Sequence, residues 1–297
     1  MEALLRHLSL PSPLQEVHYA PWKEAGVSVF FKRDDLIHPL VSGNKWRKLY
    51  GHLKVFRQRS AGRVVTFGGT YSNHLVAVAA ACRYLGIPAI AVVRGEIDEQ
   101  NPALQLVRSE GMTLYPVSRA DYRLKDTAAF ISELKSRWGA DTYILPEGGS
   151  GEAGLAGCRQ ILEEITIPFD HIVTACGTGT TLAGITRYLP AGSRAIGISV
   201  LKGPDTLTDA VGRLAGSDRF KVITGYHLGG YGRKDDRLLS FIRQFQQATS
   251  IPLDFVYTGK MVYAVDDLIR KRYFAPGSRL VLLHTGGILN APVSSHL

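Results

Sequence analysis

Lys45 directly follows Ser42, Gly43 and Asn44 in the segment FKRDDLIHPLVSGNKWRKL (31–49). A helix-like pattern begins here, so we expect Lys45 to lie at a helix start. Loss of water and the positive end of the helix both favour the neutral amine, which is the form that makes a Schiff base. Covalent amine chemistry is therefore one interpretation of Lys45, although this segment taken alone favours an ordinary solvated lysine.

A second candidate segment is TFGGTYSNH (66–74), which joins a strand-like run to a helix-like run. Apolar residues recur downstream at helical spacing, at Leu75, Val78, Ala79, Cys82 and Leu85. This spacing predicts a helix that begins near Ser72 or Asn73, either of which is a good N-cap. The first helical turn would favour an anion such as a carboxylate. Plain capping after a glycine turn is the alternative.

The third segment is ACGTGTTLAGI (175–185), again a strand, a glycine loop and a helix. Glycines let the backbone approach a ligand, and the hydroxyls of Thr178, Thr180 and Thr181 add donors, so the loop suits a phosphate monoester. It is not a Walker A loop, because no Gly-Lys-Ser/Thr follows, and it is not a dinucleotide fingerprint, because Leu182 stands where the third glycine would be.

Other catalytic schemes lack their residues. The segment GGSG (148–151) has no closing glycine for a nucleophile elbow, because Glu152 stands there. No His-Glu-x-x-His pattern is present, and the nine histidines are scattered. We therefore expect no metal site.

The elements that position these segments alternate along the chain. Apolar, β-branched runs between helix-like runs predict parallel strands covered on both faces, and hence an α/β protein with one or two open sheets. The expected strands are 63–69, 89–95, 113–117, 142–149 and 171–177, and the expected helices are 73–86, 101–111, 124–139 and 154–165. Ligands collect at the carboxyl ends of such strands.

Composition limits the partners. The net charge is +9, but the basic residues are dispersed and no nucleic-acid-binding signature accompanies them, so we expect affinity for small anions and no nucleic-acid partner. No apolar run approaches the ~18 residues that span a bilayer, and no secretory signal is apparent. We expect the three cysteines, Cys82, Cys158 and Cys176, to be reduced thiols in the core. These features favour a cytoplasmic protein without a membrane partner.

Together, FKRDDL, SGNKWRKL, GGTYSNH, GTGTT, VYTGK (256–260) and HTGG (284–287) resemble the fold-type II enzymes that depend on pyridoxal 5'-phosphate (PLP). Within that group they resemble the D-cysteine desulfhydrase and 1-aminocyclopropane-1-carboxylate (ACC) deaminase family. The resemblance implies two open, mostly parallel twisted sheets covered by helices, as in the tryptophan synthase β-subunit. It implies a large domain of residues 1–46 and 156–297, a small domain of residues 47–155, and a homodimer.

The resemblance also implies residue roles. Lys45 would bind PLP covalently and move the substrate's Cα proton, with Tyr257 and Tyr231 facing the substrate as further catalytic candidates. Ser72, Asn73 and His74, with Tyr257, would bind the substrate. The residues expected to hold the cofactor are Lys45, Asn44, Asn73, Gly177, Thr178, Gly179, Thr180, Thr181, Thr258 and Thr285.

Three positions bear on the activity that the resemblance implies. Deaminases of the family carry glutamate at the position of Thr258, leucine at that of Thr285 and glutamine at that of His74, so this chain follows the desulfhydrases. A carboxylate beside the pyridine nitrogen keeps it protonated, whereas a neutral threonine leaves less charge to spread into the ring. That difference suits loss of a β-leaving group better than opening of a cyclopropane.

The expected function is PLP-dependent β-elimination from a small amino acid, with D-cysteine giving pyruvate, sulfide and ammonia. ACC deaminase, sulfo-amino-acid lyase and a PLP-binding protein without turnover are the alternatives. The sequence departs from the family at Ser42, Tyr71, Leu75 and Val76, close to the expected substrate site.

Overall fold

The computed structural model describes residues 1–287, so residues 288–297 of the predicted large domain lie outside the described residues. The chain forms two compact units: unit 1 contains residues 1–9 and 38–157, and unit 2 contains residues 10–37 and the chain from Cys158 onward. Residues 1–9 belong to unit 1 because His7 stacks on Tyr84, with ring centroids 4.4 Å apart. The predicted division into a large domain of residues 1–46 with 156–297 and a small domain of residues 47–155 stays a prediction.

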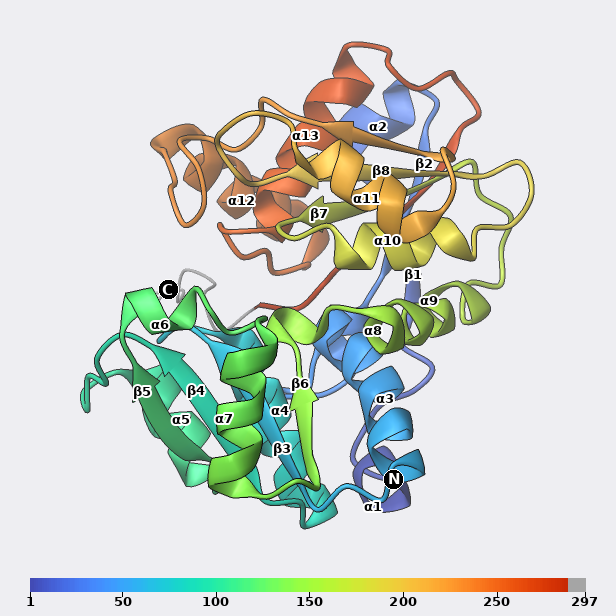
Figure 1. Cartoon of the computed structure of the whole chain (residues 1–297). Helices are drawn as coiled ribbons and strands as arrows, with labels where there is room; N and C mark the ends of the chain where they lie inside the picture. Colours follow the sequence, from blue (N-terminus) through green and yellow to red (C-terminus); the bar gives the residue numbers. More distant parts are fainter. Residues whose placement is uncertain (288–297) are drawn as a thin grey trace. The chain divides into compact units, whose positions relative to one another are not determined.

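Unit 1 is built on a parallel sheet in the order β5-β4-β3-β6. Its strands are β3 (Arg63–Gly68), β4 (Ala89–Arg94), β5 (Thr113–Val117) and β6 (Thr142–Leu145). Helices α4 (Asn73–Leu85) and α5 (Pro102–Ser109) lie on one face of this sheet, and α7 (Ala128–Trp138) lies on the other (Figure 1). The remaining elements are α1 (Glu2–Leu5), α3 (Gly43–Gln58), α6 (Arg119–Tyr122), η2 (Glu147–Gly149) and α8 (Glu152–Gly157).

Burial explains why the strands of unit 1 read as unbroken apolar runs. Val65 and Phe67 of β3 pack with Phe130 and Leu134 of α7, and α4 covers the opposite face. Both faces of the sheet therefore need apolar side chains. The helix predicted over 124–139 begins later, at Ala128, because the Thr127 hydroxyl caps it by accepting a hydrogen bond from the Phe130 amide at 3.3 Å.

Unit 2 contains a six-stranded sheet in the order β1-β2-β10-β7-β8-β9. Its strands are β1 (Leu14–Glu16), β2 (Ser28–Lys32), β7 (His171–Cys176), β8 (Arg194–Ser199), β9 (Phe220–Ile223) and β10 (Arg279–Leu283). All neighbouring strands are parallel except β1 and β2. The helices are α2 (Ala20–Glu24), η1 (Asp34–Leu36), α9 (Arg159–Glu163), α10 (Thr180–Arg187), α11 (Leu207–Ala215), α12 (Asp236–Thr249) and α13 (Thr258–Arg270).

The core of unit 2 lies between its sheet and the helices α2, α12 and α13. Trp22 of α2 and Phe245 of α12 pack there with Phe31 of β2, and the ring centroids of Trp22 and Phe245 are 5.4 Å apart. On the other face α10 packs against β7 and β8. The predicted fold class, two mostly parallel sheets covered by helices, is confirmed.

The three cysteines, Cys82, Cys158 and Cys176, are buried and form no disulfide. Burial raises the pKa of the Cys82 and Cys176 thiols to about 12, so both are protonated and inert near neutral pH. Within residues 1–287, no helix combines the length and the apolar character needed to cross a membrane.

Candidate active site

Lys45 lies in the first turn of α3 in unit 1. The helix begins at Gly43, whose φ of +61° is a conformation that glycine adopts without strain. The Lys45 amide donates to the Ser42 carbonyl oxygen at 3.3 Å, and its ammonium nitrogen Nζ donates to Asn44 Oδ1 at 3.2 Å. The side chain is half-buried at the positive end of the helix dipole. The predicted helix start is confirmed, and Asn44 contacts the lysine, while its predicted cofactor role stays a prediction.

Ser72, Asn73 and His74 form the start of α4. Ser72 is the N-cap, and its Oγ accepts a hydrogen bond from the Leu75 amide at 3.3 Å. The start of the helix lies so close to β3 that a Cβ on Gly68 would lie 2.8 Å from Ser72 Oγ and 2.7 Å from Leu75 Cγ. Only glycine fits there. The first backbone N–H groups of α4 have no acceptor within the helix and are suited to hold a carboxylate.

His74 is buried and fixed by one neighbour. Its Nε2 lies 2.8 Å from Thr66 Oγ1, which donates its own proton to the Leu145 carbonyl at 2.9 Å. Thr66 therefore accepts from an Nε2–H of the histidine. Burial and then the positive charges of Lys45 and Lys48 hold the pKa of His74 well below its usual value, so the ring is neutral.

This protonation state limits what His74 can offer to a substrate. The Nδ1 atom carries a lone pair, so the ring offers no second N–H to a carboxylate. The backbone amides of Asn73 and His74, in the first turn of α4, and the Ser72 hydroxyl remain as donors. Lys45, Ser72, Asn73 and His74 are thus held on the starts of two helices of one unit, and the substrate-binding role of the last three stays a prediction.

The buried histidines predict a pH dependence of stability. Burial lowers the pKa of His52 and His74 in the folded chain, whereas both titrate near 6.5 when unfolded. Below pH 6.5 the unfolded chain binds more protons, so stability is lost as the pH falls. The expected loss is up to about 1.4 kcal/mol per histidine per pH unit. Urea unfolding at pH 7.5, 6.5 and 5.5 measures it.

A matched pair of variants checks the assignment. His52→Gln should make the fall in stability between pH 6.5 and 5.5 shallower, because His52 is buried against Tyr143 and Ser150. His18→Gln, at an exposed histidine, is the control for the substitution itself. A slope that His52→Gln does not alter would contradict the prediction.

The glycine loop of unit 2 follows β7 and ends at the N-terminus of α10. Gly179 is the N-cap with a φ of +79°, and a Cβ there would lie 2.6 Å from Val211. The hydroxyls of Thr178 and Thr180 lie 3.3 Å apart. Two threonine hydroxyls and the first amides of an eight-residue helix form a donor set that fits a phosphate group.

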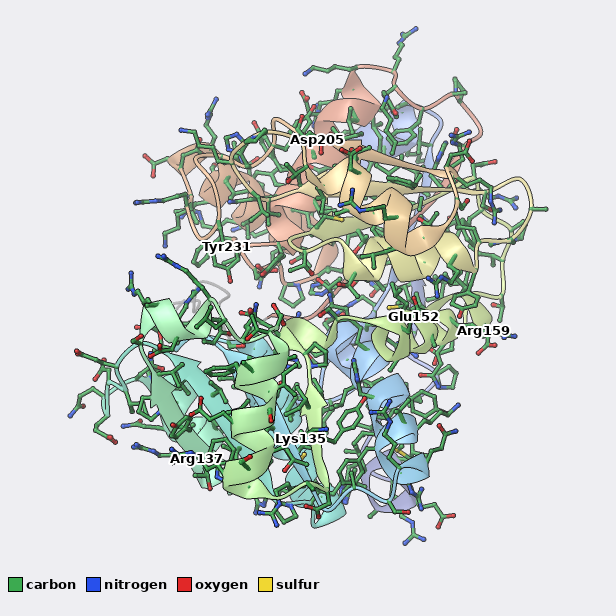
Figure 2. The ribbon with its side chains drawn as sticks, in the orientation of Figure 1. Lys135, Arg137, Glu152, Arg159, Asp205 and Tyr231 are labelled. Carbon is green, nitrogen blue, oxygen red and sulfur yellow. The ribbon has the colours of Figure 1, made fainter. Side chains whose placement is uncertain are left out.

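Tyr257 lies beside this loop. A Cβ on Gly177 would lie 3.6 Å from Tyr257 Cε1, an ordinary contact distance, so the tyrosine ring lies directly against the glycine loop. The rings of Tyr257 and Tyr231 meet edge to face, with centroids 5.8 Å apart. Burial, then the neighbouring Tyr231, raises the pKa of Tyr257, so its phenol stays protonated. Tyr231 lies on an exposed loop (Figure 2).

Asp254 anchors Tyr257 and is not among the residues predicted from the sequence. This fully buried carboxylate accepts from the amides of Val256, Tyr257 and Thr258 at 2.8, 2.6 and 2.9 Å. An aspartate a few residues before a helix start is a capping signal that could have found it. The Thr258 hydroxyl also donates to Asp254, at 2.5 Å, and accepts from the Asp254 amide at 3.1 Å. Its only proton is therefore used within the loop, and its cofactor role stays a prediction.

Lys260 is the second residue that the sequence analysis missed. Its buried ammonium donates to the carbonyl oxygens of His227 and Gly230, both at 2.7 Å. These carbonyls belong to the loop that carries Tyr231. Lys260 of the VYTGK motif thus stabilises the loop that carries Tyr231, while Asp254 stabilises the segment that carries Tyr257.

Thr285 follows the last strand of the sheet. The amide of His284 donates to the Lys32 carbonyl at 3.0 Å, and His284 Nε2 lies 2.7 Å from the Pro252 carbonyl. Asp35 lies 3.6 Å from His284 Nδ1 and makes two hydrogen bonds with Arg33. The FKRDDL and HTGG motifs therefore meet in the sheet of unit 2, and Thr285 is buried there.

The fold assembles the predicted residues into two sets. Unit 1 holds Lys45, Asn44, Ser72, Asn73 and His74, and unit 2 holds Gly177, Thr178, Gly179, Thr180, Thr181, Tyr231, Tyr257, Thr258 and Thr285. The departures Leu75 and Val76 are buried core residues of α4, whereas Tyr71 is exposed. In residues 1–287, no cluster of three or more metal-ligating side chains is present.

Comparison with known proteins decides the family. The family described as pyridoxal-phosphate dependent enzyme matches residues 6–286. The chain belongs to this family. The family cofactor, PLP, fits the residues present, since a half-buried lysine lies at one helix start and a donor-rich glycine loop at another.

Relatives of this PLP-dependent enzyme carry two kinds of name. A putative ACC deaminase of Pyrococcus horikoshii is 32% identical over 90% of this chain and 86% of its own. A mitochondrial bifunctional D-cysteine desulfhydrase/ACC deaminase of Arabidopsis thaliana is 29% identical over 94% of this chain and 77% of its own. The crystal structure of an ACC deaminase homologue matches with a TM-score of 0.81 and 31% identity, covering 97% of this chain and 94% of that one.

Proposed function

We propose that this PLP-dependent enzyme is a β-eliminating lyase that converts D-cysteine, or a close relative, and water to pyruvate, sulfide and ammonia. The observation that carries the proposal is the pairing of Lys45 with the start of α4 in unit 1, which offers an amine and a carboxylate site together. A protonated tyrosine beside the glycine loop of unit 2 supports it.

Each residue has a proposed task in this reaction. PLP, when bound, supplies an electron sink that makes the substrate's Cα proton removable. Lys45 Nζ binds the cofactor and then takes that proton. The amides of Asn73 and His74 and the Ser72 hydroxyl orient the carboxylate. Gly177, Thr178, Gly179, Thr180 and Thr181 hold the cofactor phosphate, and Tyr257, aided by Tyr231, donates a proton where the leaving group departs.

Two residues support elimination over ring opening. Thr258 and Thr285 are both neutral and buried, and within residues 1–287 the only carboxylate bonded to either is Asp254, which three backbone amides already engage. Such surroundings favour a cofactor ring with little added positive charge. ACC deaminase activity is the second candidate, because the relatives from Pyrococcus and Arabidopsis carry that name.

Product analysis tests the proposal directly. We expect pyruvate and sulfide from D-cysteine at a kcat/KM at least about tenfold above that for release of 2-oxobutyrate from ACC. Sulfite release from a sulfonated amino acid would identify the sulfo-amino-acid lyase alternative instead. Absence of pyruvate and sulfide from D-cysteine would contradict the proposal, and PLP binding without any turnover would identify a binding protein.

The assembly and location remain parts of the proposal. We expect a homodimer that works in the cytoplasm on a small amino acid, without a nucleic-acid or membrane partner. Sedimentation of the PLP-loaded chain at several concentrations measures the assembly, and a monomer at all of them would contradict the dimer.

A further inference from the structure

A pocket of about 870 Å³ lies at the carboxyl ends of three strands of unit 1, and no residue proposed above to bind substrate or cofactor lines it. Its walls come from Gly69 and Thr70 after β3, Arg94 to Ile97 at and after β4, and Pro116 to Arg119 at and after β5. The carboxyl edge of a parallel sheet is where open α/β folds bind ligands.

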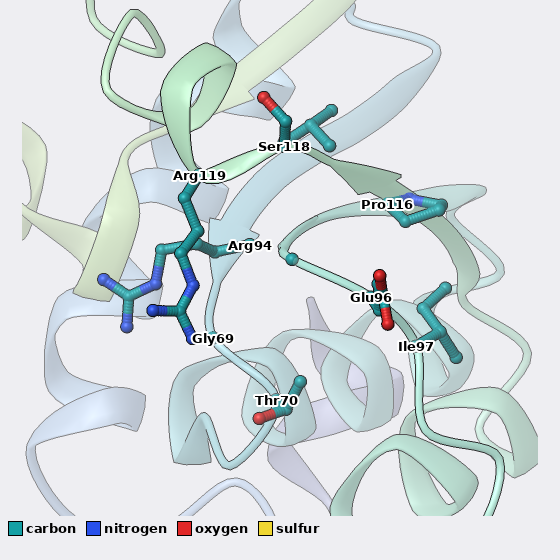
Figure 3. A pocket seen from close by; sticks show the side chains of 10 residues that line it. Gly69, Thr70, Arg94, Glu96, Ile97, Pro116, Ser118 and Arg119 are labelled. Carbon is teal, nitrogen blue, oxygen red and sulfur yellow. The ribbon is translucent and has the colours of Figure 1, made fainter.

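Arg94 and Arg119 give this pocket its charge. Both side chains are exposed, and neither makes an ion pair with any residue between 1 and 287. Figure 3 shows both reaching toward the side of the pocket where Gly69 and Thr70 lie, with Glu96 on the other side. Two like charges in one pocket repel each other, and an oxyanion between them would remove that repulsion.

The scaffold holds both arginines in place. The Arg94 guanidinium stacks on the buried ring of Tyr122, 5.6 Å from its centroid. Gly69 leaves room for it, because a Cβ there would lie 3.3 Å from Arg94 Nη2. Arg119 begins α6, which Ser118 caps by accepting from the Asp121 amide at 3.1 Å.

The walls are fixed in the same way. The Gly95 amide donates to the Val117 carbonyl at 2.8 Å and joins the ends of β4 and β5. The Ser118 hydroxyl donates to Asp121, so it has no proton for a ligand. Thr70 and the two guanidinium forks are therefore the side-chain donors that face the pocket. Such forks bind phosphate, sulfonate or carboxylate oxygens in pairs.

We propose that this pocket binds the oxyanion group of a small ligand, held by Arg94 and Arg119 with Thr70. The site goes beyond the proposed elimination reaction and does not depend on it. Its position does tie it to the substrate loop, because the Gly69 carbonyl accepts from the Ser72 amide at 3.2 Å. A bound anion would therefore rest against the turn that leads into α4.

Calorimetric titration of the PLP-loaded full chain with inorganic phosphate tests the site, because PLP already fills the glycine loop of unit 2. We expect saturable binding that Arg119→Ala weakens about tenfold or more, since hydrogen bonds to charged groups are among the stronger ones. Arg94→Lys keeps the charge but loses the paired N–H donors of the guanidinium, and it should weaken phosphate binding several-fold.

Arg123→Ala is the matched control. Arg123 is exposed, ends the same short helix as Arg119, and does not line the pocket. Its loss should change phosphate affinity less than about twofold, because only net charge is altered. Absence of saturable binding, or equal weakening by Arg123→Ala and Arg119→Ala, would overturn the proposal.

A second titration identifies the source of the oxyanion. If the oxyanion belongs to an amino acid with a second anionic group, O-phosphoserine should displace phosphate. Arg119→Ala should then weaken the binding of O-phosphoserine without changing the binding of serine. If it is a separate anion, phosphate should bind together with O-phosphoserine. Either result supports the pocket, and neither depends on which amino acid the enzyme turns over.

Discussion

Replacing Lys45 with alanine is expected to lower kcat/KM by about 10³-fold or more, because in the proposed reaction one amine both binds the cofactor and moves the Cα proton. The visible absorption of the PLP-loaded protein should change at the same time, since the covalent bond to Lys45 can no longer form. Lys45 occupies the first turn of a sixteen-residue helix, so alanine should leave α3 folded. Steady-state kinetics and the absorption spectrum with added PLP measure both effects.

The same helix offers a control. Lys54 is exposed and lies over the Tyr50 ring, 4.4 Å from its centroid. Lys54→Ala should keep both the absorption band and kcat/KM within about twofold, because it removes a surface charge alone. A Lys45→Ala protein that kept the band and full activity would show that another group carries the chemistry.

Replacing Asp254 with alanine is expected to cost about 2–4 kcal/mol of stability and to lower kcat. Its carboxylate is fully buried and satisfies three amides and the Thr258 hydroxyl, so its loss leaves four buried donors without an acceptor. Tyr257 loses the bond that fixes its backbone and should place its phenol less well. Urea unfolding and kinetics with the same protein separate the two effects.

Asp205 provides a comparison with the same chemistry at the surface (Figure 2). It accepts from the amide of Thr208 at 3.1 Å and from its hydroxyl at 2.7 Å, but it is exposed. Asp205→Ala should cost less than about 1 kcal/mol and leave kcat unchanged. Asp254→Asn keeps one acceptor oxygen, so its loss of stability should fall between those of Asp254→Ala and Asp205→Ala. Equal effects of Asp254→Ala and Asp205→Ala would rule out an anchoring role for Asp254.

Local patterns predicted the strands and the helix starts because burial on both faces of a sheet demands apolar runs. The start of α4 at Asn73 and the strand before Gly177 follow from sequence spacing alone. The start of α7 does not follow from the sequence spacing. Thr127 could cap a helix or extend a loop, and only packing decides between these two conformations. Lys260 was missed for a related reason, since its partners are backbone carbonyls of a distant loop that carry no sequence signal. Asp254, in contrast, lies before a helix start, where a capping signal could have found it.

Lys45 shows what the sequence by itself determined and what the tertiary structure decided. Its place after Ser-Gly-Asn predicted a lysine at a helix start, because helix starts and glycine turns are local properties. Its reactivity stays a prediction. The neighbourhood of Lys45 and His74, the neutral state of His74, and the pocket with Arg94 and Arg119 are tertiary. They depend on strands that are distant along the chain ending at one edge of a sheet, and hydrophobic periodicity does not encode which loops meet there.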